Sequence, residues 1–245
     1  MKKALTIGAA VLLCVSATTG AYGAENASNP LASVNNTDVR LQYYDLGSSD
    51  RIDFWAADGA YMLTPKLKLK YEVHYWSTDV TGSRENELET VHLKPIYFPK
   101  QGMIGSWKYK LAVGAELIMD FGHDDKGIGS GSDQIAPLVG LALVPREGTV
   151  LIPLVQHFQD FNGKDLSTTA LRLIGLEALP NNNWFKLDAI FRVDWENNND
   201  TPTTVEFQFG KNFSPSFAAY AEGLLGVGGD RSYDWGVGVG IRFNY

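Results

Sequence analysis

Six lysines stand at alternating positions in three neighbouring stretches of the chain. They are Lys66, Lys68, Lys70, Lys94, Lys108 and Lys110. If these stretches are adjacent antiparallel strands, the alternation places the ammonium groups on one face and in one half of a sheet. If that face lines a pore, positive charge there favours small anions, so one hypothesis is a basic constriction that selects anions. The alternative is that the lysines pair with acidic residues of the same face, with Glu72, Glu116 and Asp188 as partners.

The four histidines are the other side chains that could carry chemistry: His74, His92, His123 and His157. We expect His74 and His92 to point inward from neighbouring strands. Neither has a serine nearby in a recognisable nucleophile setting, and the spacing of the histidines is not that of a metal site. The glycines of the chain have strand spacing or lie in loops, and no helix follows them, so they predict no nucleotide site. The sequence therefore predicts no enzyme, no cofactor and no metal.

Strands must position these residues. From Tyr233 to Tyr245, apolar and polar residues alternate without a break. The apolar positions are aromatic at both ends of this stretch and aliphatic in the middle. A lipid-facing strand of an outer-membrane barrel has this layout, because aromatic rings lie at the two interfaces of the bilayer. An amphipathic strand of a soluble sandwich would also alternate, so the rest of the chain must decide between them.

About twelve strand-like segments can be distinguished, and two kinds of connection alternate between them. Every second connection carries a proline: Pro65, Pro99, Pro145, Pro180 and Pro215. The others are polar and often longer: residues 47–50, 77–87, 122–133, 162–165, 197–200 and 228–232. Outer-membrane barrels alternate short periplasmic turns with longer external loops, whereas a soluble sandwich has no reason to do so. We therefore predict an all-β, antiparallel, up-and-down transmembrane β-barrel of about 12 strands.

The N-terminus predicts export. Lys2 and Lys3 precede an apolar stretch, and small residues follow at Ala21 and Gly23, which together indicate a cleaved secretory signal peptide over residues 1–23. Cys14, the one cysteine, lies within this segment. Residues 24–37 form a polar leader, which is either a periplasmic tail or a plug of the lumen. The barrel is expected over residues 38–245.

Composition narrows the function classes. The formal net charge is -7, and it becomes -9 when the two signal-peptide lysines are removed, leaving 19 basic against 28 acidic residues. An acidic chain with no basic arm is a poor nucleic-acid binder. No mature segment has the roughly 18 consecutive apolar residues of a membrane helix. If the protein spans a membrane it must do so as a closed barrel, because lipid offers no partner for unpaired backbone groups.

The expected barrel is wide enough for a narrow pore. About eight strands are filled by side chains and 16 to 18 leave an aqueous channel, so twelve lie between these cases. We expect the lumen to be lined, and its selectivity set, by charged residues: Lys68, Lys70, Lys94, Lys110, Asp188, Arg192 and Arg242. Gly236, Gly238 and Gly240 leave one inner wall bare, which either receives bulky inward side chains or widens the solute path.

Several short motifs lie in the second half of the chain. They are APLVG at 136–140, LVPREG at 143–148, LIPLVQ at 151–156, NWF at 183–185, VDW at 193–195 and EFQFGK at 206–211. Together with the closing strand, they resemble the transporter-like outer-membrane family named after the MetA pathway of phenol degradation. The resemblance implies an outer-membrane barrel that passes small molecules, aromatic ones among them, and it supplies no site residues.

The sequence thus predicts an outer-membrane channel or transporter for small solutes, aromatic or anionic compounds among them. A structural or adhesion barrel with a blocked lumen is one alternative, and a membrane-lipid-modifying barrel enzyme is another. The expected partners are outer-membrane lipids, a small-molecule solute and the barrel assembly machinery, which would engage the strand from Tyr233 to Tyr245. No nucleic-acid partner is expected, and the oligomeric state is left open.

Overall fold

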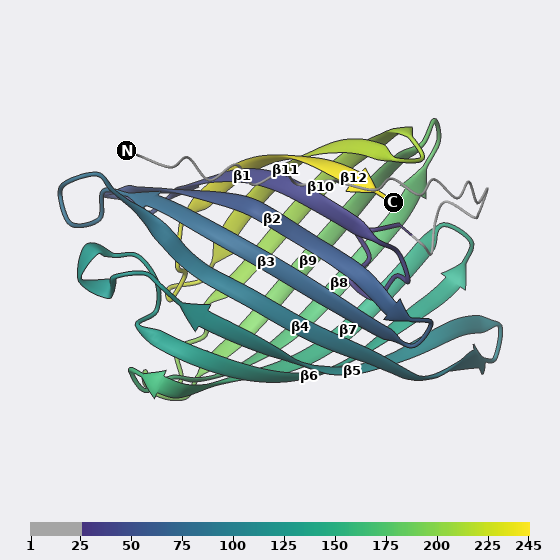
Figure 1. Cartoon of the computed structure of the whole chain (residues 1–245), viewed down its shortest axis with the longest axis horizontal. Coiled ribbons are helices and arrows are strands. Elements are labelled where there is room, and N and C mark those ends of the chain that lie inside the picture. The colour runs from purple at the N-terminus through teal and green to yellow at the C-terminus, as the bar shows by residue number, and fades with distance from the viewer. Residues whose placement is uncertain (1–25) are drawn as a thin grey trace, which may run out of the picture.

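Twelve antiparallel strands close into a barrel in the computed structural model, which describes residues 26–245 (Figure 1). The strands are β1 (Asn36–Asp45), β2 (Asp50–Thr64), β3 (Leu67–Thr78), β4 (Glu85–Ile104), β5 (Trp107–Asp120), β6 (Ser132–Arg146), β7 (Thr149–Gly163), β8 (Ser167–Leu179), β9 (Asn183–Asp194), β10 (Thr203–Ser214), β11 (Phe217–Val227) and β12 (Trp235–Asn244). Each strand pairs with its neighbours in sequence, and β1 pairs with β12 to close the ring. The predicted up-and-down barrel is confirmed. The expected signal peptide lies outside the described residues.

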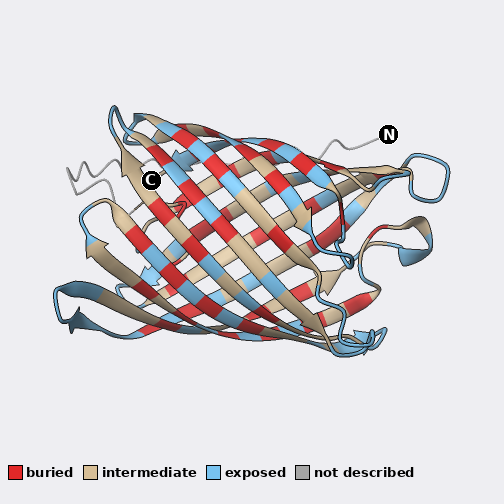
Figure 2. Cartoon of the chain, turned by 180° about the vertical axis from the view of Figure 1, so that it is seen from behind, coloured by how far each residue is buried: buried red, intermediate tan, exposed pale blue. Residues whose placement is uncertain are grey.

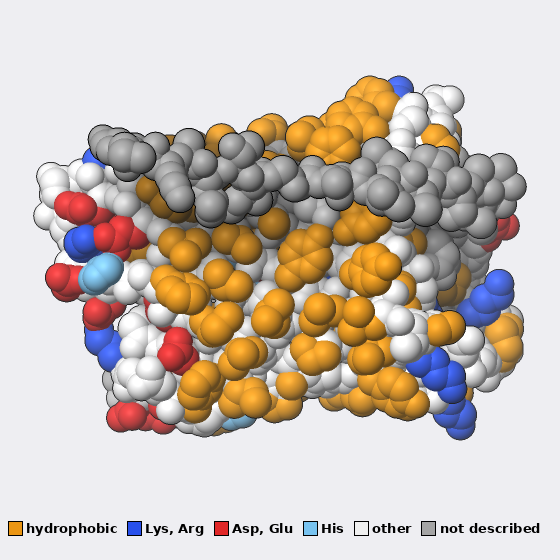
Figure 3. Space-filling view, in the orientation of Figure 1, with side chains coloured by type: hydrophobic (Ala, Val, Ile, Leu, Met, Phe, Trp, Pro, Cys, Tyr) orange, Lys and Arg blue, Asp and Glu red, His pale blue; other side chains and the backbone are white. Residues whose placement is uncertain are grey.

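Alternation along each strand divides the side chains into an inner and an outer set (Figure 2). In β12 the outward Val239 is 59% exposed, whereas the inward Arg242 is 5% exposed. Exposed large apolar side chains lie on every strand, and on the face seen in Figure 3 they gather over the middle of the barrel while charged side chains gather at its two ends. A closed ring has no unpaired edge, so this surface can lie in hydrocarbon with every ladder hydrogen bond satisfied. No helix in residues 26–245 is long and apolar enough to cross a membrane.

The two kinds of connection lie at opposite ends of the barrel (Figure 1). The turn end carries the short connections at residues 65–66, 105–106, 147–148, 180–182 and 215–216. The loop end carries residues 46–49, 79–84, 121–131, 164–166, 195–202 and 228–234. β1 starts and β12 finishes at the turn end, which corresponds to the periplasmic side of an outer-membrane barrel.

Two prolines differ from the sequence prediction. Three of the five expected in turns lie there, but Pro99 lies within β4 and Pro145 near the end of β6. Pro99 falls at a register shift between Tyr97 and Lys100. The pairing of β6 with β7 also shifts beside Pro145. A shifted register tolerates a residue without an amide hydrogen, so proline marks a strand irregularity here and not a turn.

Candidate functional site: a lumen in two halves

The bare glycine wall is filled by side chains of the adjacent, hydrogen-bonded strand. A Cβ atom on Gly240 would lie 2.3 Å from Tyr220 Cζ, and one on Gly238 would lie 2.7 Å from Glu222 Oε2. On β10, a Cβ atom on Gly210 would lie 2.0 Å from Trp184 Cζ2. Of the two alternatives, the structure therefore supports the close packing of bulky inward side chains. The glycines do not widen the path.

The half of the lumen nearest the turn end is packed like the core of a soluble protein. It includes Leu31 of the leader, which is 1% exposed. The buried residues packed with it are Ile96, Phe98, Ala112, Ala142, Val150, Ile152, Ile174, Leu176, Trp184, Ala218 and Tyr220. They come from β4 to β9 and from β11, so the leader is part of a buried cluster that extends around much of the inner circumference. Apolar burial of this extent holds the leader inside the barrel.

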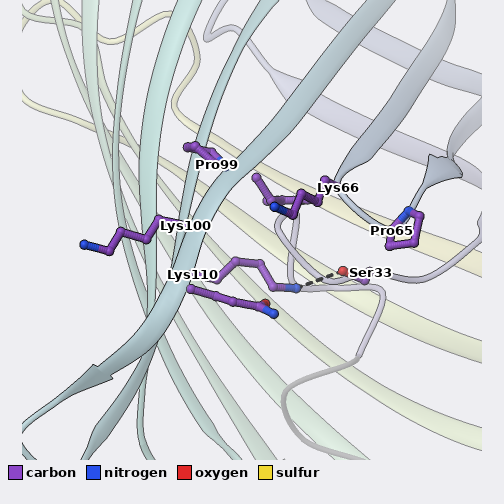
Figure 4. A pocket seen from close by; sticks show the side chains of 8 residues that line it. Ser33, Pro65, Lys66, Pro99, Lys100 and Lys110 are labelled. Carbon is purple, nitrogen blue, oxygen red and sulfur yellow. Dashed lines mark hydrogen bonds between the residues drawn. The ribbon is translucent and has the colours of Figure 1, made fainter.

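Two of the predicted lumen lysines hold the leader in place. Lys68 Nζ donates to the carbonyl oxygens of Pro30 and Ala32, at 3.1 and 2.8 Å. Lys110 Nζ donates to Ser33 Oγ at 2.9 Å (Figure 4). The described part of the leader, residues 26–35, thus lies in the lumen as a plug and not outside it as a tail. Two lysines of the predicted cluster therefore bind the leader of the same chain.

A third contact joins the leader to the closing strand. Arg242 Nη2 lies 2.6 Å from Asp38 Oδ2, and Arg242 Nη1 donates to Ser28 Oγ at 2.8 Å. Ser28 Oγ in turn donates to Gln208 Oε1 at 2.7 Å. The plug is therefore tied to β1, β10 and β12 by a connected polar network, in addition to its apolar contacts.

Above the plug, a cavity of about 470 Å³ extends to Ser232 in the last loop at the loop end. The cavity is lined by nine basic residues: Arg40, Arg51, Lys68, Lys70, Lys94, Arg172, Lys186, Arg192 and Arg242. Five acidic residues line it as well: Asp38, Asp58, Glu72, Asp188 and Glu206. The lining is basic in balance although the whole chain is acidic. A smaller pocket of about 240 Å³ lies at the turn end, between Ser33, Lys66 and Lys110 (Figure 4).

Part of the excess positive charge is neutralised by pairing with carboxylates, which was the alternative expected for the lysines. Lys94 Nζ lies 2.8 Å from Glu116 Oε2, and Lys70 Nζ lies 3.4 Å from Glu72 Oε1. Both acidic partners are those expected from the sequence. The third expected carboxylate has a different partner. Asp188, expected to pair with the lysine cluster, instead accepts hydrogen bonds from Arg172 Nε, at 2.8 Å, and from Arg172 Nη2.

The predicted lining residues fall into two groups. Lys68, Lys70, Lys94, Asp188, Arg192 and Arg242 line the cavity. Lys110 lies below the plug and contacts the leader. Two further lysines of the cluster, Lys66 and Lys108, are exposed at the turn end.

Arg51 and Arg172 were missed by the sequence prediction. The Arg51 guanidinium carbon lies 4.3 Å from the centroid of the Tyr44 ring and 4.2 Å from that of Trp76. The pairing of β2 with β3 shifts between Trp55 and Ala57, so the inward positions change from odd to even numbers there. This β-bulge blurs the alternation of β2 and hides the inward direction of Arg51. Arg172 has the regular inward parity of β8 and could have been found from it.

Ion pairing is uneven among the cavity arginines. Arg40 lies 2.9 Å from Asp58, and Arg242 is paired with Asp38. Within residues 26–245, neither Arg51 nor Arg192 lies within 4.0 Å of a carboxylate. Arg192 Nη1 donates one long hydrogen bond, of 3.4 Å, to Thr204 Oγ1. These two guanidinium groups therefore carry uncompensated positive charge in the half of the lumen nearest the loop end.

One wall of the cavity is apolar. Leu138 of β6 and Leu154 of β7 line it, and Ala136 is buried on the same face of β6. The charged residues come from β1 to β4, from β8 to β10 and from β12. A solute in this cavity thus meets positive charge on one side and hydrocarbon on the other.

The barrel also brings the two inward histidines together. Glu72 of β3 faces His92 of β4 in the strand register, and the ring centroids of His74 and His92 are 4.9 Å apart. In the part of the chain that the structure describes, Glu72, His74 and His92 are the single group whose ligand atoms are near enough to share a metal ion. The sequence spacing of these three residues does not indicate a metal site, because the pairing register of β3 with β4 brings them together.

The chain matches none of the protein-family models, and no curated protein sequence matches it. Solved structures do match its fold. An outer membrane channel from Pseudomonas putida F1 superposes with a TM-score of 0.64 at 9% identity, covering 94% of this chain and 100% of that one. The KdgM porin in complex with disordered oligogalacturonate gives 0.58 at 10% identity, with coverage of 86% and 99%. Outer membrane phospholipase A from Escherichia coli gives 0.53 at 13%, with coverage of 92% and 99%.

At these identities the likeness shows the fold alone. That fold is the closed barrel of outer-membrane proteins, which agrees with the apolar outer surface described above. Because the matched barrels include a channel, a porin and a phospholipase, the function of this chain has to be argued from its own lumen.

Proposed function

We propose that the protein is an outer-membrane channel for small organic anions, with the loop end facing the outside of the cell. The cavity supplies the observation that carries this proposal. Nine basic residues face five acidic ones in its lining, and Arg51 and Arg192 have no carboxylate partner in the described chain. A positive pore wall concentrates anions and excludes small cations. Two barrels of similar fold, a channel and a porin, support the same class of function.

The shape of the lining favours anions that carry a ring or another apolar part. Arg51 lies between two aromatic faces, and stacking leaves the edge of a guanidinium group free to bind a carboxylate with two hydrogen bonds. Leu138 and Leu154 offer an apolar surface in the same cavity. Aromatic carboxylates combine the two features. This preference agrees with the resemblance to the transporter-like family of the MetA pathway, and the substrate itself remains a proposal.

Reversal potentials in planar bilayers under a KCl gradient test the anion preference. The proposal expects chloride to permeate better than potassium, and it expects this preference to fall when Arg51 and Arg192 are both replaced by Gln. The matched control is Lys108→Gln, which removes one positive charge at the turn end, outside the cavity. A cation preference in the unmodified protein, unchanged in the double variant, would refute the proposal.

Lipid hydrolysis is the second candidate, because one matched fold is a phospholipase. Thr90 Oγ1 lies 2.8 Å from His92 Nε2, and His92 Nδ1 lies 2.9 Å from Glu116 Oε1, in the order of a hydroxyl–imidazole–carboxylate relay. The Thr90 hydroxyl, however, donates to Glu89, and Thr90 is 3% exposed. A nucleophile must reach its substrate, so this relay argues for a structural network. Phospholipid hydrolysis and acyl-transfer assays, with His74→Ala and His92→Ala variants, decide between the two functions.

A further inference from the structure

We propose that Glu72, His74 and His92 form a binding site for a divalent transition-metal ion, with Zn²⁺ as its best match, on the inner wall of the barrel. Two imidazoles and one carboxylate are ligands that Zn²⁺ accepts in proteins. The three residues offer one ligand atom each, and these atoms lie within 4.8 Å of one another. The proposal is separate from channel function and can hold or fail without it.

The donor atoms converge on one carboxylate oxygen. Glu72 Oε2 lies 3.5 Å from His74 Nε2 and 3.6 Å from His92 Nδ1. Zinc bonds of about 2.0–2.1 Å at tetrahedral angles place neighbouring donor atoms about 3.4 Å apart. The observed separations are therefore close to the edges of a zinc coordination tetrahedron, and small side-chain movements suffice to close them around an ion.

Each imidazole has its second nitrogen held by a neighbouring side chain. His74 Nδ1 lies 3.3 Å from Asp53 Oδ2, and His92 Nε2 lies 2.8 Å from Thr90 Oγ1. A hydrogen bond from the far nitrogen to a carboxylate fixes the tautomer and turns the other nitrogen toward the metal, as in carboxylate–histidine–zinc arrangements. Asp53 gives His74 this arrangement.

One donor atom of the group is buried without a hydrogen bond. His74 is 6% exposed, and its Nε2 atom has no hydrogen-bond partner in the structure, although it points toward Glu72. A buried polar atom without a partner costs free energy, and a bound ion would remove that cost for a neutral imidazole. This atom is the second, independent indication of a ligand at the site.

The neighbouring lysines leave the metal-facing oxygen accessible. Lys70 and Lys94 approach Glu72 through Oε1, at 3.4 and 4.0 Å, and not through the Oε2 atom that faces the imidazoles. Glu116 Oε1 lies 2.9 Å from His92 Nδ1, so the ion would replace this hydrogen bond when it binds His92. Glu72 also lines the cavity, so an ion that enters from the loop end reaches the site along the lumen.

Isothermal titration of the refolded barrel in detergent with ZnCl₂ tests the proposal, with MgCl₂ as the hard-cation control. We expect one Zn²⁺ per chain and no Mg²⁺ binding, because Mg²⁺ prefers oxygen ligands. His74→Gln, His92→Gln and Glu72→Gln are each expected to weaken Zn²⁺ binding more than tenfold, and Asp53→Asn is expected to weaken it about tenfold or more by releasing His74. His157→Gln is the matched control. Its imidazole contacts Thr169 on β8, away from this group.

The absence of stoichiometric Zn²⁺ binding in the unmodified protein overturns the proposal. So does an affinity that is unchanged in the His74 and His92 variants, which would leave Glu72 and Asp53 as partners of a protonated imidazole. Folding of each variant is checked by its heat-dependent electrophoretic mobility. If a variant does not fold, the test is made on the unmodified barrel with Co²⁺. The proposal expects bound Co²⁺ to give an intense visible absorption band that added Zn²⁺ abolishes. The absence of this band overturns the proposal.

Discussion

The two halves of the lumen are built from the same alternating strands but have opposite interiors. Near the turn end, Leu31 and the apolar residues around it form a closed core, and hydrogen bonds from Lys68 and Lys110 fix the leader inside it. Near the loop end, inward positions carry arginine, lysine and carboxylates around a cavity of about 470 Å³. The contrast teaches that strand number alone does not define a pore. In this barrel the leader decides where the lumen ends.

The largest expected effect is that of removing the plug. Deletion of residues 26–34 leaves β1 intact, removes Leu31 from the turn-half core, and is expected to raise single-channel conductance severalfold. Planar-bilayer recording measures this. Lys108→Met is the control, because Lys108 is exposed at the turn end. The conductance of this variant should equal that of the unmodified protein. Unchanged conductance in the deletion variant would mean that the leader does not limit ion flow.

A single substitution should reproduce part of that effect. Leu31→Asp places a carboxylate among the apolar residues that now surround Leu31, where a charge without a partner is costly to bury. The leader is therefore expected to leave the lumen for part of the time, which should appear as brief, larger openings in the same recordings. Leu31→Met, which conserves volume and polarity, is expected to keep the conductance of the unmodified protein. Equal traces for both variants would contradict the apolar anchoring of the plug.

A third prediction concerns the packing of the turn half. Gly210→Ala places a methyl group against the Trp184 ring and is expected to destabilise the barrel by about 1–3 kcal/mol, as overpacking does. Gly223→Ala on the neighbouring strand meets no atom within 4 Å and should change stability by less than about 0.5 kcal/mol. Urea unfolding in lipid vesicles measures both free energies. Equal values would show that Trp184 does not fill the space beside β10.

The smallest effect is expected from a substitution in the apolar wall of the cavity, which should change the selectivity between two solutes. Leu154→Asn removes apolar surface from the cavity without changing its charge. Uptake of benzoate into vesicles should fall relative to uptake of acetate, by less than tenfold, because one apolar contact discriminates weakly. Leu151→Asn, on the outer face of the same strand, is the control and should leave this ratio unchanged. A fall in both uptake rates by the same factor would mean that the wall contributes no selectivity.

Much of the fold follows from the sequence because lipid imposes a strict rule. Each strand of a barrel must alternate, so the run from Tyr233 to Tyr245 and the two classes of connection suffice to predict a closed up-and-down barrel. The rule fails at irregularities. The bulge in β2 reverses the inward parity and hides Arg51, and Pro99 lies at a register shift and not in a turn.

The site was harder to predict, because its features depend on contacts between distant segments. The alternation of inward and outward positions correctly placed Lys70, Lys94 and Arg192 in the lumen. It also placed Lys68 there, but it did not show that Lys68 binds the leader. No local pattern shows that residues 26–35 fold back into the barrel. The proximity of His74 and His92 to Glu72 likewise depends on the register of β3 with β4, which a single sequence does not specify.

Chemical access to the cavity tests the account most directly. The one cysteine of the chain lies in the expected signal peptide, so Ile190→Cys introduces the sole thiol of the mature protein, on the cavity wall. A charged methanethiosulfonate reagent is added to one side of a planar bilayer at a time. We expect reaction from the loop side only, and from both sides once residues 26–34 are deleted. Equal reaction from both sides of the full-length mature barrel, or none from the loop side, would contradict a lumen that is open above the leader and that the leader narrows too far for the reagent to pass.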